Sequence, residues 1–335
     1  MHYSTRIFLM SKTAWGRAIP ATLGALLLAS QVRAAPSVID LPGDRAFPES
    51  ITATSEGTLY VGSLGAGGIY RVKLHTYKAE SWIKPGAFGT RSILGVLVDE
   101  KSNTLWACSN NLSEVGVSVA GSDTKATLKG FDLKTGAGKL SAELPGEHTF
   151  CNDIAIGQDG SVYVTNTAAP QILRLPPGGR QLEVWITDPL LAVPAGAVGL
   201  DGIAFGTDGN LYVDTYTPGK VFRIDVEGGK AGTVSSIKLS RVLVQADAIR
   251  PLREHEFLIV EGGGRLDRMV IDGDSARIDT LKDGLVVPTG ATIAGRSIWI
   301  SEGQVGYIFD PSKKGQMPKL PFRLYSIPKP AATDR

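Results

Sequence analysis

Two stretches of the chain share one pattern of hydrophobic and polar positions. In residues 151–166 and again in residues 200–215, an apolar run is followed by an Asp-Gly pair and then by a second apolar run that carries a tyrosine. Aligning the two stretches places Asn152 on Asp201. Glycine accepts the positive φ that a tight hairpin turn requires, so each stretch predicts two antiparallel strands joined by a short turn.

The same unit recurs in weaker form along the chain. Four further copies begin at Glu49, Gly95, Asp247 and about Thr289. The starting positions are separated by roughly 40 to 57 residues, which is the period of a four-stranded propeller blade and suits neither short solenoid repeats nor helical arrays. We therefore expect an all-β fold, a six-bladed β-propeller, in which residues 36–330 form a single domain.

Each hairpin is followed by a segment in which apolar and polar residues alternate, which predicts a half-buried third strand. These segments are residues 67–74, 128–136, 171–179, 220–229, 265–274 and 305–310. An aromatic residue recurs in the second strands, where we expect it to pack between blades, at Tyr60, Trp106, Tyr163, Tyr212 and Trp299. The short apolar segment at residues 36–42 and the C-terminal residues 320–328 are expected to complete the last blade from the two ends of the chain.

Composition agrees with a turn-rich β protein. Of the 335 residues, 40 are Gly and 19 are Pro, and 43% are hydrophobic. The first 34 residues differ from the rest, because they contain no acid and combine an apolar run at residues 18–29 with four basic residues, Arg6, Lys12, Arg17 and Arg33. This order is typical of a secretory signal peptide, and the run is shorter than the roughly 20 residues of a membrane span. We expect residues 1–34 to be a cleaved signal peptide, with a membrane anchor as the alternative, and the mature protein to be periplasmic or secreted.

Net charge narrows the range of partners. The whole chain has a formal charge of +2, and loss of the four basic residues of the leader would bring the mature chain to about −2. The chain has no long Lys/Arg run and no basic stripe interleaved with aromatic residues, so we do not expect nucleic acid as a partner. A small molecule is the expected partner, with no membrane association after cleavage, and the pattern leaves the oligomeric state open.

The two cysteines fall at neighbouring strand ends. Cys108 ends a predicted second strand, and Cys151 immediately precedes the first strand of the next blade. Antiparallel strands bring these two ends to the same side of the sheet, and an exported protein meets an oxidising compartment. We hypothesise a disulfide between the two blades, and two buried thiols are the alternative.

Polar residues open most of the predicted first strands. In a propeller the first strand of each blade lines the central channel, so a position repeated in every blade forms a ring around the axis. Four of the six positions, Glu49, Asn152, Asp201 and Asp247, carry a carboxylate or amide oxygen. Oxygen ligands suit a hard cation such as Ca²⁺, Mg²⁺ or Mn²⁺, whereas the alternative is that these are solvent-facing turn residues.

In these positions the chain resembles the gluconolactonase/regucalcin family of six-bladed propellers. The resemblance depends on Pro48-Glu49-Ser50, Asn152-Asp153, Gly199-Leu200-Asp201-Gly202 and Asp247, in this order and at blade spacing. It implies one divalent cation, most often calcium, with Glu49, Asp201 and Asp247 as ligands and Asn152 beside it in contact with water or substrate. Zn²⁺, Mn²⁺ or Mg²⁺ are the other candidates. Asp201 departs from the neutral amide that the family usually has there.

The resemblance also implies a reaction, the hydrolysis of a lactone to a hydroxy acid. In this reaction the cation polarises the carbonyl, and Asp247 both binds the cation and orients or deprotonates water. Phe150 stands where sugar-lactone members tend to carry an arginine, which with the apolar loop at residues 190–198 favours a less polar lactone or ester. Two alternatives stay open, a propeller that binds a ligand or partner without turnover and a lyase or condensing enzyme of the strictosidine synthase type.

Overall fold

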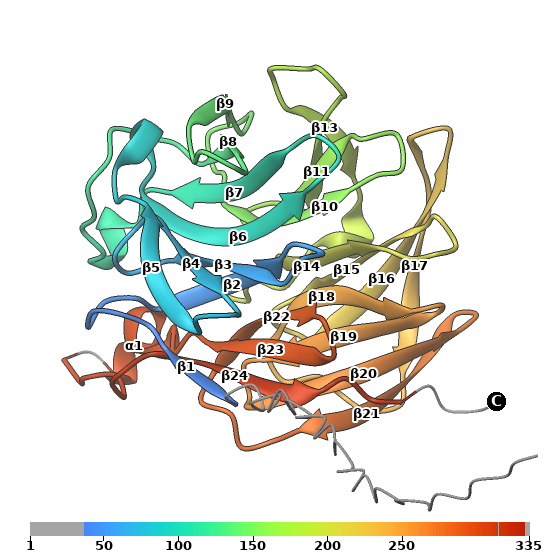
Figure 1. Cartoon of the computed structure of the whole chain (residues 1–335). Helices are drawn as coiled ribbons and strands as arrows, with labels where there is room; N and C mark the ends of the chain where they lie inside the picture. The colour runs from blue at the N-terminus through green and yellow to red at the C-terminus, as the bar shows by residue number, and fades with distance from the viewer. Residues whose placement is uncertain (1–36, 314, 332–335) are drawn as a thin grey trace, which may run out of the picture. The chain divides into compact units, whose positions relative to one another are not determined.

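The computed structural model describes residues 37–313 and 315–331. The predicted signal peptide at residues 1–34 lies outside the described residues. Within the described part, no helix has the length and apolar character needed to cross a membrane. The fold is all-β and propeller-like, and four-stranded units follow one another along the chain (Figure 1).

The strands group into five sheets instead of the six that the sequence predicts. Four sheets have four strands each: β2 (Pro48–Ala53), β3 (Thr58–Ser63), β4 (Ile69–Lys73) and β5 (Lys78–Ile83); β6 (Ser92–Asp99), β7 (Thr104–Asn110), β8 (Thr127–Asp132) and β9 (Gly138–Glu143); β10 (Cys151–Ile156), β11 (Val162–Asn166), β12 (Gln171–Leu175) and β13 (Glu183–Thr187); and β22 (Pro288–Ala294), β23 (Ser297–Glu302), β24 (Arg323–Pro328) and β1 (Val38–Asp40). The fifth sheet has eight strands: β14 (Leu200–Phe205), β15 (Leu211–Thr215), β16 (Lys220–Glu227), β17 (Lys230–Leu239), β18 (Ala246–Arg253), β19 (Glu256–Glu261), β20 (Arg265–Asp272) and β21 (Ser275–Lys282).

The eight-stranded sheet consists of two antiparallel meanders that are joined at their outer strands. The meander β14–β17 and the meander β18–β21 meet through a short parallel pairing, Lys238 with Ser275 and Leu239 with Ala276. The outer strands are long here, ten residues in β17 and eight in β21, so they reach each other at the rim. This contact is the reason why the structure does not divide into six separate sheets.

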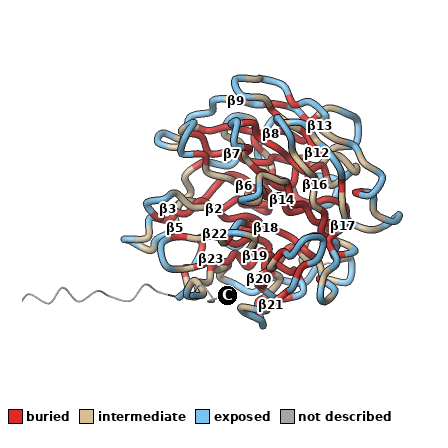
Figure 2. Tube along the Cα trace, turned by 90° about the vertical axis from the view of Figure 1, so that its right-hand side faces the viewer, coloured by how far each residue is buried: buried red, intermediate tan, exposed pale blue. Residues whose placement is uncertain are grey.

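The first strands of the units contact one another in a closed cycle. In the described chain β2 contacts β6, β6 contacts β10, and the series continues through β14, β18 and β22 back to β2. Figure 2 shows that buried residues follow these inner strands, whereas exposed residues lie mainly in outer strands and turns. The first strands therefore line one central region, as a propeller requires.

Each hairpin between a first and a second strand contains one residue with positive φ at the same place. The Asp-Gly turns behave as predicted, with φ of 83° at Gly160 and 81° at Gly209. Where the sequence has no glycine, a residue with a side chain adopts the same conformation, at φ 52° for Asn103 and 55° for His255. Asn tolerates this region better than most residues, which explains why the hairpin survives the loss of glycine there.

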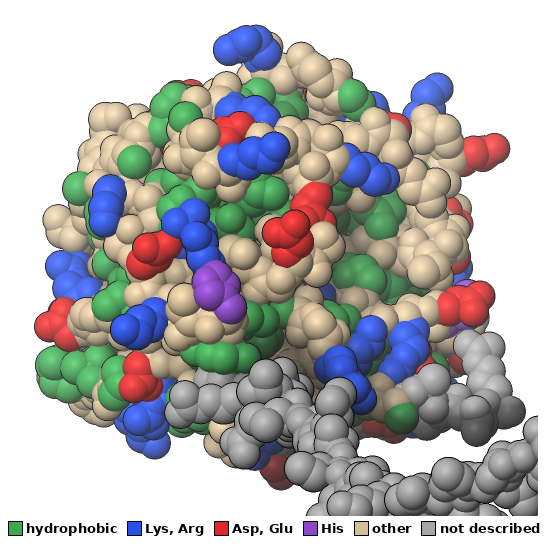
Figure 3. All heavy atoms as spheres, in the orientation of Figure 1, with side chains coloured by type: hydrophobic (Ala, Val, Ile, Leu, Met, Phe, Trp, Pro, Cys, Tyr) green, Lys and Arg blue, Asp and Glu red, His purple; other side chains and the backbone are tan. Residues whose placement is uncertain are grey.

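The hydrophobic core lies in layers between neighbouring units. One layer joins Tyr163 and Ile172 to Val213 and Phe222 of the next meander, and another layer joins Tyr212 to Phe257. The recurrent aromatic residues of the second strands thus pack between units, as the sequence predicts for Tyr163 and Tyr212. On the face shown in Figure 3, acidic and basic side chains are interspersed among the polar and hydrophobic ones.

The two ends of the described chain close the ring in one sheet, as predicted. β1 pairs antiparallel with β24, so the sheet has the order β1-β24-β23-β22. The prediction of a third strand at residues 305–310 is wrong, because a short helix, α1 (Gly306–Phe309), occupies that segment. Gln304, at φ 53°, turns the chain out of β23, and the third-strand place is taken by β24.

Short helical turns lie in the connections, at η1 (Ala87–Gly89), η2 (Ser113–Val115), η3 (Pro189–Leu191) and η4 (Pro311–Lys313).

Candidate functional site

Every first strand brings at least one residue to the central cavity, and the residue that lines it from β6 is Gly95, not Leu94. Strand register makes the equivalent positions Glu49, Leu94, Asn152, Asp201, Asp247 and Thr289. A narrow cavity that has no room for a water molecule in this structure is lined by four predicted site residues, Glu49, Asn152, Asp201 and Asp247. The structure therefore places these four side chains, which are far apart in the sequence, around one space.

The second unit departs from the sequence alignment by one residue. The alignment puts Gly95 in the ring, but Ile93 pairs with Ser109 and Val96 with Ala107, which makes Leu94 the equivalent of Glu49. The β6–β7 hairpin is one residue longer than the β2–β3 hairpin, because Val96 and Ala107 are 11 positions apart whereas the equivalent Ile51 and Val61 are 10 apart, and this extra turn residue shifts the alignment by one position.

A β-bulge recurs in every first strand and serves the site. In β2, for example, the register shifts between Pro48 and Ile51, which leaves Glu49 and Ser50 outside regular pairing. Both of these residues line the cavity, as do both Asn152 and Asp153 in β10. Bulges commonly redirect side chains next to functional sites, and here they give two consecutive residues access to the axis.

Glycines allow the first strands to approach closely. A Cβ atom built on Gly95 would lie 2.2 Å from the carbonyl oxygen of Asn152, and one on Gly202 would lie 2.2 Å from that of Asp247. Any side chain at these two places would force neighbouring strands apart. The close approach keeps the cavity narrow and draws its carboxyl groups together.

The cavity is rich in buried carboxyl groups. Glu49 is 7% exposed, and Asp201 and Asp247 are each 5% exposed. Burial, followed by repulsion from neighbouring carboxylates, raises the pKa of Glu49, of Asp201 and of Asp247 well above their ordinary values. A hydrogen bond from Asn152 acts in the opposite direction on the pKa of Asp201 without reversing the shift.

A buried ion pair lies beside these carboxyl groups. Arg250 donates from Nη1 to Asp153 Oδ2 at 2.6 Å and from Nη2 to Asp153 Oδ1 at 2.9 Å, a two-pronged pairing. Arg250 Nη2 also contacts Ser50 Oγ at 3.4 Å, so the side chain links β18 to β10 and β2 across the centre. The pairing raises the pKa of Arg250 despite its burial.

Asp214 is a further buried acid that the sequence analysis missed. Its Oδ1 accepts a hydrogen bond from the backbone N–H of Gly202 at 2.8 Å, but its Oδ2 has no partner in the described chain. Burial and repulsion from Asp201 raise the pKa of Asp214. The signal was present in the sequence, because Asp214 is a charged residue in an otherwise apolar second strand. Arg250, a charged residue that follows Ala248 and Ile249 in the first strand β18, is a second example.

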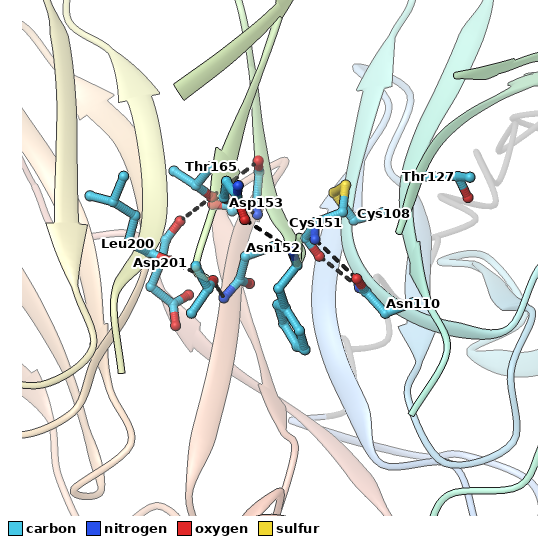
Figure 4. Close-up of a disulfide and its surroundings, with 12 residues drawn as sticks. Cys108, Asn110, Thr127, Cys151, Asn152, Asp153, Thr165, Leu200 and Asp201 are labelled. Carbon is cyan, nitrogen blue, oxygen red and sulfur yellow. Dashed lines mark hydrogen bonds between the residues drawn. A yellow bond between two sulfur atoms is a disulfide. The ribbon is translucent and has the colours of Figure 1, made fainter. Parts of the chain in front are cut away.

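Asn152 is held by neighbouring polar groups, as Figure 4 shows. Its Nδ2 donates to Thr167 Oγ1 at 2.9 Å, and the Thr167 hydroxyl donates to the Leu200 carbonyl at 2.6 Å. Thr165 Oγ1 donates to the Asp201 carbonyl at 2.7 Å. These contacts connect β10 to β14 and fix the backbone next to two cavity residues.

A disulfide fastens the other side of β10 (Figure 4). Cys108 and Cys151 are bonded, with their Cα atoms 5.2 Å apart. Next to the bond, Asn110 Nδ2 donates to the Cys151 carbonyl at 2.8 Å, and the Cys151 N–H donates to Asn110 Oδ1 at 3.0 Å. The strand that carries Asn152 is thus attached to both neighbouring units.

Two aromatic residues near the site differ in position. Tyr216, which the sequence analysis did not single out, is half-buried, and its pKa is raised by burial and by Asp247. Phe150 is half-buried and packs against the hydrophobic core, and it is not among the residues that line the cavity. Its predicted contact with substrate stays a prediction.

Comparisons with known proteins agree on the fold. Residues 34–72 match the family described as strictosidine synthase-like, N-terminal. The chain is similar to the major allergen Mala s 1 of Malassezia sympodialis, with a TM-score of 0.67 and 15% identity over 87% of this chain and 96% of that one. It is also similar to a gluconolactonase from Xanthomonas campestris, with a TM-score of 0.61 and 15% identity over 88% and 89%. Virginiamycin B lyase from Staphylococcus aureus gives a TM-score of 0.57 and 14% identity over 86% and 97%.

The described chain is a β-propeller. At these identities the likeness shows the fold alone, and the family match covers a short part of the chain. Comparison with curated protein sequences gives no significant match.

The buried side chains in the propeller's centre offer oxygen donors that suit a hard cation, but the distances between them do not form a metal site in the described chain. Among residues 37–313 and 315–331, no group of three or more His, Cys, Asp or Glu side chains is arranged to hold a metal ion. Five acids, namely Glu49, Asp153, Asp201, Asp214 and Asp247, are nevertheless buried there with Arg250 as the basic residue beside them. Burying uncompensated charge is costly, and a divalent cation would offset this excess.

Proposed function

We propose that this propeller is a metal-dependent hydrolase that opens a lactone or a related carboxylic ester. The observation that carries the proposal is the meeting of Glu49, Asn152, Asp201 and Asp247 around one cavity, where buried carboxyl groups outnumber the one buried arginine of the described chain's centre. The fold that the chain shares with a gluconolactonase is compatible with this activity.

The proposal treats the ring as six blades. The eight-stranded sheet then counts as two blades, β14–β17 and β18–β21, whose outer strands touch at the rim. The closed cycle of six first strands in the described chain supports this count.

Glu49, Asp201 and Asp247 would hold the cation. The proposed ion is Ca²⁺, because all the donors are oxygen atoms, and Zn²⁺, Mn²⁺ or Mg²⁺ are the other candidates. When bound, such an ion acts as a Lewis acid toward a carbonyl oxygen. These side chains would have to rearrange to hold it, since no group of three or more in the described chain is arranged to bind a metal ion.

The chain's own residues supply the remaining chemistry. Asp247 accepts a proton from the attacking water as the water oxygen bonds to the carbonyl carbon. The bond from that carbon to the ring or ester oxygen then breaks, and the departing oxygen takes up a proton. Asn152, fixed by Thr167, offers its amide to water or substrate, and the half-buried Tyr216 offers a phenol close to Asp247.

Export belongs to the same proposal. We propose that residues 1–34 are a signal peptide and that the mature protein works in the periplasm or outside the cell. The disulfide between Cys108 and Cys151 supports this, because such bonds persist mainly in oxidising compartments.

A propeller that binds a ligand or partner without turnover is the second candidate. The observation that favours it is the spacing of the carboxylates, which do not converge on a metal site in the described chain. Such a protein would keep its polar centre for structure or for binding.

The deciding experiment is a panel of aliphatic, aromatic and sugar lactones and aryl esters, assayed with the purified mature protein. The hydrolase should lose turnover with a chelator and regain it with Ca²⁺, Zn²⁺ or Mn²⁺. If the panel shows no metal-dependent turnover while metal still raises the melting temperature, the binding function is the better account.

A further inference from the structure

A groove separates two sheets away from the central cavity. It encloses about 860 Å³ between the β6–β9 sheet and the β10–β13 sheet. The β6–β7 and β10–β11 turns border it, and these turns follow the ends of the first strands that lie farthest from the ring residues. The groove and the central cavity share no lining residue.

A glycine in β8 accounts for the opening. Gly130 pairs with Trp106 of β7, and Trp106 also lines the groove. In four other units the third-strand residue at this place is an arginine that forms an ion pair with an acid, namely Arg71, Arg174, Arg223 and Arg268. In those units a long arginine side chain takes this place, whereas Gly130 has no side chain to fill the space beside Trp106.

The indole N–H of Trp106 is buried beside the groove without a hydrogen-bond acceptor among the described residues. Trp106 is 8% exposed, and its Nε1 has no hydrogen-bond partner in the described chain. The equivalent tyrosines do have partners, since Tyr60 donates to the Leu133 carbonyl at 3.4 Å and Tyr212 donates to Asp208 at 2.9 Å. A buried donor without an acceptor costs free energy, so an acceptor that enters the groove would gain from it.

Three cationic side chains, those of Lys101, Lys139 and Arg180, line the groove. Lys101 and Arg180 line it and form no side-chain ion pair or hydrogen bond in the described part of the chain. Lys139 donates only to neutral acceptors, such as Thr104 Oγ1 at 2.8 Å.

The two acids that line the groove, Asp99 and Glu100, each accept a hydrogen bond from a serine hydroxyl. Asp99 accepts from the Ser102 hydroxyl at 2.5 Å, and Glu100 accepts from the Ser55 hydroxyl at 2.9 Å. Three cationic side chains against two carboxylates leave the lining with an excess of one positive charge, which attracts an anion.

We propose that this groove is a second ligand site, which binds a small organic anion with a flat apolar body, such as an aromatic carboxylate. Leu140, Ile156 and Val162 supply apolar walls, Trp106 supplies a ring and a donor, and the rim supplies the cations. The volume lies within the range of roughly 300 to 1,000 Å³ that small-molecule pockets occupy. The site is independent of the proposed hydrolase activity.

The proposal is tested by titrating the mature protein with 2-naphthoate in a calorimeter, beside the neutral analogue 2-naphthalenemethanol. The wild type should bind naphthoate saturably and the alcohol more weakly, with an affinity for naphthoate that falls as salt is added. Trp106→Phe keeps the ring and removes the donor, so it should weaken naphthoate binding by about tenfold.

Trp299→Phe is the matched control, because Trp299 occupies the equivalent second-strand place and its Nε1 also lacks a partner, but it does not line the groove. This variant should bind naphthoate like the wild type. Ile156→Phe should block binding by filling the groove, and circular dichroism should show that each variant is folded. Absence of saturable binding to the wild type, or equal loss in Trp106→Phe and Trp299→Phe, would overturn the proposal.

Discussion

At the residue scale, Asp247 has two roles in the proposed mechanism, because it binds the cation and also acts as the base. Asp247→Asn keeps the size and one oxygen donor but cannot accept the proton. We predict a loss of lactone turnover of about 10²- to 10⁴-fold, the usual contribution of a general base. Steady-state kinetics and metal titration of the same variant separate the two roles.

The control for this variant is Asp274→Asn, because Asp274 lies at an exposed outer turn and pairs with Arg223. It should keep wild-type turnover. Full turnover in Asp247→Asn would remove Asp247 from the mechanism.

Arg250 links three strands at the centre of the propeller, so its replacement should lower the free energy of unfolding. Arg250→Met would leave the buried Asp153 with its hydrogen bond from the Ile203 N–H and without its positive partner. We predict destabilisation of about 3 to 5 kcal/mol, because breaking a buried pair leaves an uncompensated charge. Urea unfolding measures this change in the free energy of unfolding.

The double variant Arg250→Met/Asp153→Asn provides the comparison. It removes both charges, so it should recover a large part of the stability lost in the single variant. A double variant as unstable as the sum of two single variants would mean that the pair is not energetically coupled.

A second buried carboxyl pair gives the propeller a pH dependence of its own. Asp267 and Glu261 are buried together with Arg241, whose Nη2 lies 2.8 Å from Asp267 and 2.7 Å from Glu261. Burial, then the hydrogen bond with Glu261, raises the pKa of Asp267 to about 7, while the contact with Thr280 acts against the rise. Burial would also raise the pKa of Glu261, but hydrogen bonds from Asp267 and Arg241 outweigh it and the pKa is lowered.

The sign of the pH effect follows from these shifts. Asp267 keeps its proton in the folded protein up to about pH 7, whereas the unfolded chain releases it near pH 4. Unfolding therefore releases a proton between these values, and stability should fall as pH rises from about 5 to 7, by on the order of 1 kcal/mol per unit. Glu261 acts in the opposite direction, but below this window.

Asp267→Asn tests this pair, because it retains a donor to Glu261 and does not titrate. Urea midpoints measured at several pH values between 5 and 7.5, with chelator present, should show a flatter profile for the variant than for the wild type. A variant with an unchanged slope would assign the pH dependence to other groups.

At the scale of elements, the cross-unit disulfide is the clearest stabilising device. It joins β7 to β10 across 43 residues of sequence, and chain entropy gives such a loop about 4 kcal/mol. We predict that Cys108→Ala/Cys151→Ala lowers the free energy of unfolding by about 2 to 4 kcal/mol. Thermal unfolding under oxidising and reducing conditions measures this, and the double variant should no longer respond to the reductant.

Asn110 tests whether the disulfide is the main fastening at this place. Its side chain makes two hydrogen bonds with the backbone of Cys151. If Asn110→Ala costs more stability than loss of the disulfide, the side-chain contacts hold β10 and the bond is secondary.

The hairpins were predictable from the sequence because their signals are local. Gly160 and Gly209 adopt the positive φ that tight turns require, and the flanking apolar runs define the strands. The equivalence of Leu94, instead of Gly95, to Glu49 could not be predicted, because one extra residue in the β6–β7 turn does not disturb the apolar pattern.

Long-range partners explain the rest of the difference between prediction and structure. Arg250 meets Asp153 across 97 positions in the chain, and no local pattern encodes such a pairing. The helix α1 was missed because Val305, Tyr307 and Phe309 alternate as a strand would, while β24 arrives from farther along to pair with β23. The ring residues other than Leu94 were found because four polar positions recur in register.

At the scale of the whole molecule, one sheet holds the ring closed. β1 contributes the outermost strand of the sheet that β22, β23 and β24 form, so two distant parts of the chain must meet before the cycle of first strands is complete. The pairing continues past the strand, because the Leu41 N–H donates to the Phe322 carbonyl at 2.8 Å. Leu41 and Ile39 are each 2% exposed and supply the apolar contacts through which the N-terminal segment packs against the last sheet.

Leu41→Ala tests whether closure stabilises the entire ring. We predict destabilisation of about 2 to 5 kcal/mol, the range for a buried leucine cut to alanine, and a single unfolding transition at a lower temperature. Asp40→Asn is the matched control, since Asp40 is exposed and its contact with Arg323 is a surface pair that should change stability little. Hydrogen exchange distinguishes the two possible responses: if closure holds the ring, protection falls in β2 and β22 together, whereas loss of protection confined to β1 and β24 would mean that the other sheets are stable without it.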